Sequence, residues 1–349
     1  MSPPRFARGP YGPHLSLGRE VARAVTSSPM IASKLLAPIA CLFLAAACST
    51  PPPPAPPVDF DQKLAWDHLE SIVGIGPRPS GSEGAARLRD YLEINLKALD
   101  LDSEREPFTN ETPTGPVEFE NLFVDLPPTA PGADAETAPW ILIGTHYDTK
   151  RLDQEGPNIF VGANDGGSGT AILLELARVL TQSTAAPREV GLRLLFLDGE
   201  EAVNLDWEGD DNTYGSRYHA EQLLATGQAG RFGACVILDM LGDRDLGILH
   251  ETYSRRALME LFEQAAERAG LGQHMQTRRW QAVRDDHQSF LKIGIPSVDL
   301  IDFDYGPQNS WWHTNEDTLD KCSAASLGAA GTIFMTGLPD LERWVLEQQ

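Results

Sequence analysis

The chain has 349 residues and a formal charge of −22, with 28 lysines and arginines against 50 aspartates and glutamates. This length allows one large domain or two small ones. So acidic a chain argues against nucleic acid and anionic membrane surfaces as partners, and it favours neutral or cationic substrates.

Residues 1–47 differ from the rest of the chain. They are basic and end in an apolar run, residues 35–47, with Met30 as an alternative start. The run is too short to span a membrane and has the length of the apolar region of a secretory signal. Residues 44–48 resemble the cleavage box of a bacterial lipoprotein, except that Ala45 stands where a larger aliphatic residue is usual.

We therefore expect a signal peptide over residues 1–47 and a lipidated Cys48. A Pro-rich tether follows over residues 48–58, and a single catalytic domain spans residues 59–349. Polyproline segments are semi-rigid spacers, so this one would hold a domain away from a membrane. The protein is expected to face the periplasm or the cell exterior, attached to the membrane only through Cys48. A plain cleaved signal is the alternative.

Cys235 and Cys322 are the two cysteines within the predicted domain. One possible pair does not make a disulfide framework. We expect both to be unpaired small core residues.

From residue 59 onward, helical and apolar extended segments alternate. This pattern predicts an α/β fold in which a mostly parallel central sheet carries helices on both faces. The expected helices are 61–73, 83–99, 170–182, 214–224, 255–269, 286–292 and 323–347. The expected strands are 118–126 at an edge of the sheet, 140–144, 192–197, 234–240 and 296–301.

The dipeptide Glu200-Glu201 follows one of these strands, residues 192–197, which is apolar except for Arg193. Ligands of open α/β sheets bind at the carboxyl ends of the strands. Two adjacent carboxylates there repel each other unless a cation or a shared proton separates their roles. One can bind a metal while the other transfers protons. A solvated acidic turn is the simpler interpretation of the dipeptide alone.

Two other predicted strands also end in polar side chains, and two loops add more. His146 and Asp148 follow the strand at residues 140–144, and Asp239 ends the strand at 234–240. Asp165 and His313 lie in loops. Buried carboxylates require a cation or strong hydrogen bonds. Aspartate, glutamate and histidine around an open position suit a catalytic zinc.

These motifs resemble the zinc-dependent exopeptidase superfamily of aminopeptidases, over about residues 60–349. Within it, the chain is most similar to the glutaminyl-peptide cyclotransferases, or glutaminyl cyclases. The 19-residue interval between His146 and Asp165 is also cyclase-like, whereas typical aminopeptidases have a shorter one. The motifs that carry the resemblance are His-Tyr-Asp-Thr-Lys at 146–150, Asp-Gly-Glu-Glu-Ala at 198–202, Trp207, Tyr-Gly-Ser-Arg at 214–217, Asp-Asp-His-Gln-Ser-Phe-Leu at 285–291 and Trp-His-Thr at 312–314.

The resemblance implies a zinc exopeptidase-like α/β/α sandwich with one zinc per chain, bound by Asp165, Glu201 and His313. It implies Glu200 as the proton shuttle and Asp239 as a hydrogen-bond partner of the leaving group. The same resemblance gives Asp285 the role of supporting Asp239, and makes Trp207 and Trp312 the walls of the substrate pocket. His146 and Asp148 would lie near the metal without holding a second ion.

The implied reaction is the cyclisation of N-terminal glutamine in peptides or proteins to pyroglutamate, with release of ammonia. We expect a monomer that binds no nucleic acid. Two positions depart from the animal cyclases: Thr145 replaces the first cysteine of their disulfide, and Asp299 replaces a histidine. Asp239, Asp285 and Asp299 would then need a shared proton or an added cation.

Two other functions remain open at this point. One is a secreted aminopeptidase with two zinc ions bridged by Asp165, which would use His146, Glu201, Asp239 and His313. The other is a catalytically silent lipoprotein that only binds peptides, although the complete set of acids argues against it.

Overall fold

The computed structural model describes residues 60–152, 159–182 and 187–348. The predicted signal peptide (1–47), the Pro-rich tether with Cys48 (48–58) and the predicted first residue of the domain, residue 59, lie outside these ranges. The helices are α1 (Gln62–Ile75), α2 (Glu83–Ala98), α3 (Gly167–Gln182), α4 (Tyr214–Ala225), α5 (Arg256–Arg268), α6 (His287–Lys292) and α7 (Ala324–Glu347). The strands are β1 (Glu104–Thr112), β2 (Gly115–Leu126), β3 (Trp140–His146), β4 (Gly191–Leu197), β5 (Phe232–Asp239), β6 (Ile248–Glu251), β7 (Met275–Gln281) and β8 (Ser297–Ile301).

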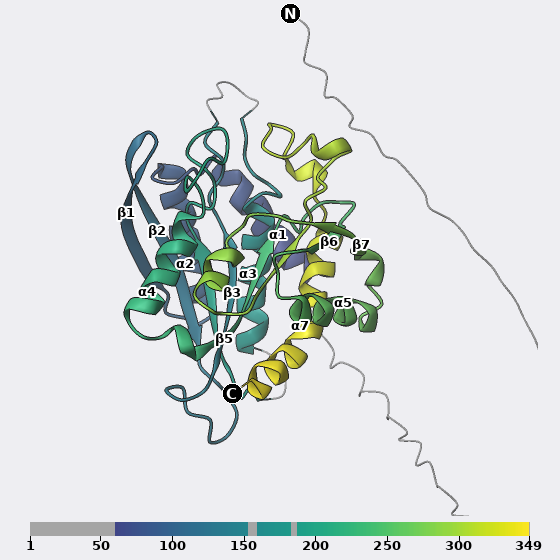
Figure 1. Ribbon diagram of the computed structural model, residues 1–349. Helices are drawn as coiled ribbons and strands as arrows, with labels where there is room; N and C mark the ends of the chain where they lie inside the picture. Colours follow the sequence, from purple (N-terminus) through teal and green to yellow (C-terminus); the bar gives the residue numbers. More distant parts are fainter. Residues whose placement is uncertain (1–59, 153–158, 183–186, 349) are drawn as a thin grey trace, which may run out of the picture. The chain divides into compact units, whose positions relative to one another are not determined.

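Six described strands form the central sheet in the order β1-β2-β4-β3-β5-β8. Figure 1 labels β1, β2, β3 and β5 of this sheet. β4, β3, β5 and β8 run parallel, whereas β1 and β2 form an antiparallel hairpin that pairs with β4. The mostly parallel α/β fold is thus confirmed. The carboxyl ends of β3, β4, β5 and β8 meet at one edge, where such sheets bind ligands.

The prediction that residues 118–126 form an edge strand is wrong, because β2 lies between β1 and β4. β1 takes the edge instead. Its sequence, EREPFTNET, is largely polar and exposed on alternate residues, so it lacks the apolar run that marks an inner strand. The two-stranded sheet of β6 and β7 was also not predicted, since β7 reads MQTRRWQ.

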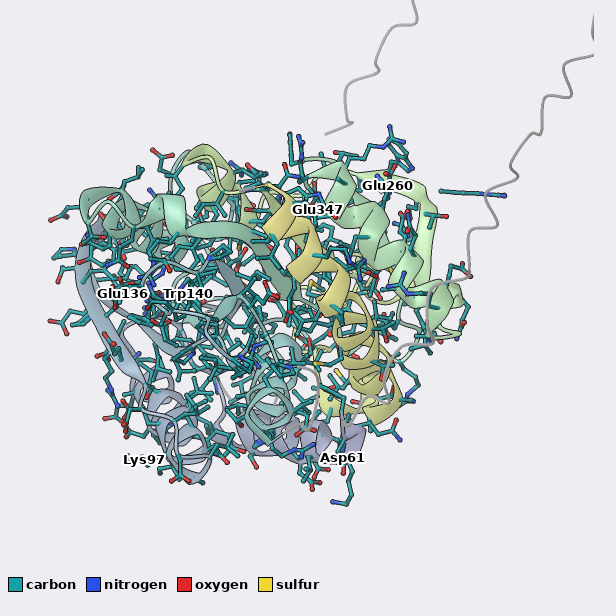
Figure 2. The ribbon with its side chains drawn as sticks, turned by 90° about the horizontal axis from the view of Figure 1, so that it is seen from below. Asp61, Lys97, Glu136, Trp140, Glu260 and Glu347 are labelled. Atoms are coloured by element: carbon teal, nitrogen blue, oxygen red, sulfur yellow. The ribbon has the colours of Figure 1, made fainter. Side chains whose placement is uncertain are left out.

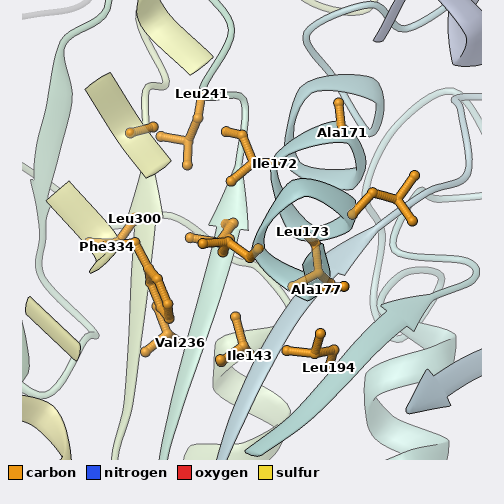
Figure 3. Close-up of a cluster of buried hydrophobic side chains, with 14 of the residues drawn as sticks. Ile143, Ala171, Ile172, Leu173, Ala177, Leu194, Val236, Leu241, Leu300 and Phe334 are labelled. Atoms are coloured by element: carbon orange, nitrogen blue, oxygen red, sulfur yellow. The ribbon is translucent and has the colours of Figure 1, made fainter. Parts of the chain in front are cut away.

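Alternate residues of the buried strands face two separate cores. On one side Ile143, Leu194 and Val236 pack in the same cluster as α3 and α7 (Figure 3). On the other, Leu142, Leu195 and Ile237 pack with apolar residues of α4 and α6. Both faces of the sheet are therefore covered. Burying one such side chain stabilises the fold by about 1.5–3 kcal/mol.

Two helix starts agree closely with the sequence analysis. Asp61 caps α1, where its side chain accepts from the backbone N–H of Lys63 and Leu64, and Ser82 caps α2 by accepting from Ala85. In the view from below, α7 runs toward Glu347 beside α5, which carries Glu260 (Figure 2). Among the described residues, no helix is both long and apolar enough to cross a membrane.

Arg193, the one charged residue in β4, has a direct partner. Its guanidinium donates two hydrogen bonds of 2.7 Å to Asp125, the residue opposite it on β2. Cys235 and Cys322 are buried and unpaired, as expected.

Candidate active site

Asp165, Glu201 and His313 come together at the carboxyl edge of the sheet, and we call them the metal triad. The Nε2 of His313 lies 3.0 Å from Oε1 of Glu201 and 3.4 Å from Oδ2 of Asp165. One ligand atom from each residue fits within 4.8 Å of the others. Ligands at about 2.0–2.2 Å from one zinc have spacings of this order.

Three of the four carboxylate oxygens of the triad have no hydrogen-bond partner among the described residues, and a lysine, Lys150, has its Nζ 3.8 Å from Oε2 of Glu201. Both carboxylate oxygens of Glu201 and Oδ2 of Asp165 are buried and accept no hydrogen bond from any described residue. Burying an anionic oxygen without a partner is costly. This arrangement, with one imidazole and two carboxylates, fits zinc.

His313 has an unusual backbone conformation. Its φ is 54°, in the left-handed region that side-chain-bearing residues seldom adopt. Its ring stacks on Trp312 with centroids 3.8 Å apart. Such conformations cluster at functional sites because the surrounding structure must hold them in place.

The metal triad opens into a pocket of about 270 Å³. The lining residues include Asp165 and His313 of the triad and five further residues singled out in the sequence: Glu200, Trp207, Asp239, Asp285 and Trp312. All eight predicted site residues therefore lie at one place. Their individual roles stay predictions.

The pocket acids are buried, and this alters their protonation. Burial raises the pKa of Glu200 well above its ordinary value; His146 opposes this shift, and Glu201 adds to it. Burial and the neighbouring Asp239 raise the pKa of Asp285 to about 6. A cation on Glu201 would favour the ionised form of Glu200.

His146 and Asp148 lie next to the triad, as expected. The Nε2 of His146 is 3.0 Å from Oδ1 of Asp239 and 3.4 Å from Oδ1 of Asp165. Asp148 accepts from the backbone N–H of both Glu200 and Glu201, at 3.2 and 3.4 Å. Asp148 thus positions the dipeptide through its backbone.

Two residues that hold the site were not found from the sequence. Asp317 accepts from the backbone N–H groups of Asn164 and Asp165, at 2.8 and 3.1 Å. Arg78 is fully buried and donates to the carbonyls of Tyr147 and Gly162. Both act on backbone atoms, so residue type and spacing gave no signal for them.

A group of side chains that could hold a metal, placed at the carboxyl ends of parallel strands, is the arrangement found in metal-dependent α/β enzymes. Residues 121–337 match peptidase family M28. A glutaminyl-peptide cyclotransferase from Drosophila melanogaster is 31% identical over 285 residues, which cover 74% of this chain and 76% of that protein. The chain belongs to peptidase family M28, and it carries that family's zinc-dependent type of site.

Solved structures show the same fold. The glutaminyl cyclase of an Acidobacteriales bacterium is 33% identical with a TM-score of 0.75, over 84% of this chain and 99% of that one. A leucine aminopeptidase precursor from Bacteroides thetaiotaomicron is 25% identical with a TM-score of 0.69, over 79% and 96%. The fold is thus common to cyclases and aminopeptidases, and the site must decide between them.

Proposed function

We propose that this protein is a glutaminyl-peptide cyclotransferase, which converts the N-terminal glutamine of peptides to pyroglutamate and releases ammonia. The observation that carries the proposal is the buried Glu200 carboxylate beside the metal triad, in a small pocket walled by Trp207 and Trp312. Its volume of about 270 Å³ is at the low end for small-molecule sites and suits one compact side chain.

The metal triad would hold a single zinc, which supplies Lewis acidity toward the γ-carbonyl oxygen of the substrate. Trp207 and Trp312 enclose the glutaminyl side chain between aromatic surfaces. Because amine and carbonyl belong to the same residue, this positioning supplies much of the rate. The pocket acids favour the N-terminal amine, which reacts in its neutral form.

Glu200 moves the proton in the reaction. The substrate α-amine forms a C–N bond to the γ-carbon, and the Glu200 carboxylate accepts the proton that this nitrogen loses. Glu200 then returns that proton to the departing amide nitrogen as the original bond between this nitrogen and the γ-carbon breaks, so ammonia leaves and the lactam remains. Asp239 accepts a hydrogen bond from the leaving nitrogen, and Asp285 supports Asp239.

A di-zinc aminopeptidase is the second candidate, and one observation favours it. His146, Asp165 and Asp239 could also hold an ion, because their ligand atoms lie within 4.8 Å of one another. A hydrolase must generate and aim a hydroxide, which a second metal assists. A cyclase carries its nucleophile on the substrate and needs one metal only.

The test is to give the purified protein a glutaminyl peptide and, separately, a leucyl anilide. A cyclase releases ammonia from the peptide and leaves the anilide intact. The zinc content is compared between wild type and Asp165→Asn, which disrupts both metal groupings. A difference of one ion supports the cyclase; a difference of two, with anilide cleavage, would assign the chain to the aminopeptidases.

We also propose that residues 1–47 are removed, that Cys48 becomes the lipidated first residue, and that residues 59–349 form a monomeric domain facing the periplasm or exterior. The apolar run before Cys48 and the Pro-rich stretch after it support this. Mass spectrometry of the mature N-terminus, cell fractionation and light scattering test these three points. An unmodified N-terminus on a protein free in the soluble fraction would contradict the anchor.

A further inference from the structure

A second group of acids surrounds a second imidazole outside the metal triad. Asp285, His287 and Asp299 each place a ligand atom within 4.8 Å of the others, and we call them the sealed cluster. Asp285 and His287 come from the start of α6, and Asp299 from the middle of β8. Asp285 is 2% exposed, and the other two are 0% exposed.

Five of the six side-chain polar atoms of the sealed cluster lack hydrogen-bond partners among the described residues, and the sixth, Oδ1 of Asp285, accepts from the backbone N–H of Asp286. Both oxygens of Asp299, Oδ2 of Asp285 and both ring nitrogens of His287 are buried and unpaired. Protein interiors rarely leave such atoms unsatisfied, because each costs a few kcal/mol. One of these atoms, Nε2 of His287, faces the carboxylate of Glu251 at 3.4 Å. The other four, three carboxylate oxygens and Nδ1 of His287, indicate a missing positive charge.

Glu251 lies on the far side of the His287 ring. Its carboxylate is anchored by three backbone N–H groups, from Tyr253, Ser254 and Val283, at 2.6–3.1 Å. Its Oε2 lies 3.4 Å from Nε2 of His287. This contact favours the tautomer with a proton on Nε2.

That tautomer leaves the Nδ1 lone pair of His287 free. Nδ1 is the nitrogen on the side of Asp299, 3.7 Å from its Oδ2. Metal-binding histidines usually donate their other N–H to a carboxylate in this way. Ligand atoms of one tetrahedral zinc lie roughly 3.4 Å apart, given bonds of about 2.0–2.2 Å.

The charges around His287 do not balance without a cation or bound protons. Three buried acids gather there: Glu251, Asp285 and Asp299. Within the part of the chain that the structure describes, neither lysine nor arginine forms an ion pair with any of them. One imidazole cannot neutralise three carboxylates.

We propose that Asp285, His287 and Asp299 bind a buried divalent cation of the zinc class, separate from the catalytic zinc. One imidazole and two carboxylates suit zinc and similar transition metals. Because the cluster is closed to solvent, this ion is structural. It fixes Asp285, a residue that also lines the substrate pocket. The competing arrangement is a proton shared between Asp285 and Asp299.

Metal analysis of the purified protein separates these two arrangements and does not depend on which reaction the enzyme catalyses. Asp165→Asn disables both metal groupings at the catalytic centre, and Asp299→Asn removes one ligand of the sealed cluster while keeping its shape. Asp299→Asn should contain one ion fewer than wild type. The Asp165→Asn protein should retain about one ion, and the double variant none.

The matched control is His250→Asn. His250 is also buried against a carboxylate, with Nδ1 2.7 Å from Oε1 of Glu263, but it belongs to no metal grouping among the described residues. Its metal content should equal that of wild type. If Asp299→Asn does not fold, the Asp165→Asn protein decides alone. After its bound metal is replaced by Co²⁺ as a spectroscopic probe, it must still bind one Co²⁺ per chain and show a visible absorption band. No bound ion in that protein, or unchanged metal in folded Asp299→Asn, would overturn the proposal in favour of the shared proton.

Discussion

Two loops border the pocket, and one aspartate holds each of them with the same set of hydrogen bonds. Asp317 accepts from the backbone N–H of Asn164 and Asp165 and, at 2.7 Å, from the hydroxyl of Tyr305. The second loop, residues 202–212, carries Trp207. We call an aspartate that accepts two backbone N–H groups and a tyrosine hydroxyl in this way an aspartate clamp. Each of the two loops has one.

Asp211 is the clamp of the Trp207 loop. It accepts from the backbone N–H of Val203 and Asn204, at 3.0 and 2.9 Å, and from the hydroxyl of Tyr214 at 2.7 Å. The first loop, residues 159–166, carries Asp165, and we call it the metal loop. It has an additional support, because Arg78 donates to the carbonyl of Gly162 at 2.7 Å.

The difference between the loops follows from what each carries. The metal loop is buried and carries Asp165, the proposed zinc ligand, whose carboxylate would have to be fixed to bind the ion. The Trp207 loop is clamped near its start, and Leu205 within it is 72% exposed. The comparison predicts that loss of one clamp alters metal affinity, whereas loss of the other alters substrate binding.

The largest effect is expected at Glu200, just before the Trp207 loop. Glu200→Gln should lower kcat by about 10³-fold or more, because an amide cannot shuttle a proton, and it should keep the zinc. Glu201→Gln is the control and should lose zinc, because a charged ligand becomes a neutral oxygen. Ammonia release and zinc content measure both. The reverse pattern would mean that the roles of the two glutamates are exchanged.

Asp317→Asn should weaken zinc binding by about 10–100-fold, the usual consequence of losing a residue that supports a metal ligand. The asparagine side chain has one acceptor atom where the carboxylate has two, so one backbone N–H of the metal loop loses its partner. Competition with a chromogenic chelator measures the affinity. Unchanged zinc affinity in the folded variant would show that the clamp does not position Asp165.

Asp211→Asn is the matched variant for the second loop. It should raise KM for a glutaminyl peptide roughly 3–10-fold, since a charge-assisted hydrogen bond contributes about 1.5–3 kcal/mol and the loop absorbs part of the loss. Zinc affinity should not change. If Asp211→Asn and Asp317→Asn alter the same parameter, the two clamps do not have separate functions.

The parts of the molecule that the sequence predicts well have a strong chemical pattern. β3, β4 and β5 are apolar runs that end in acids or histidine, and parallel strands bring their carboxyl ends together. The apolar runs thus locate the pocket. β1 and β7 were missed because strands at exposed edges have no apolar run.

The residues that the sequence did not reveal act across long separations. Asp317 bonds to backbone atoms 152 and 153 residues away, and such contacts do not depend on the side chains found there. Glu251 meets His287 only because the β6 end and the α6 start are neighbours in space. Residue spacing along the chain carries no record of these contacts.

The smallest effect is expected far from both loops, at Glu342 on α7. Burial raises the pKa of Glu342 to about 7, with Arg188 opposing the shift. In the unfolded chain, the Glu342 carboxyl group is protonated only below about pH 4.5, whereas in the folded protein it stays protonated up to about pH 7. Because the folded state holds one more proton between these pH values, its stability falls as pH rises through that window. Glu342→Gln has no such loss.

The Glu342→Gln variant should therefore match wild type near pH 4.5 and exceed it in unfolding free energy by about 1–2 kcal/mol at pH 7–8. One pKa unit corresponds to about 1.4 kcal/mol, and partial solvent exposure reduces the full value. Urea denaturation at a series of pH values measures this difference. Because Glu342 contacts neither loop, kcat, KM and zinc affinity should stay unchanged, which separates global stability from the local effects of the two clamps. A stability difference that is constant with pH would show that Glu342 is ionised in the folded state as readily as in the unfolded one.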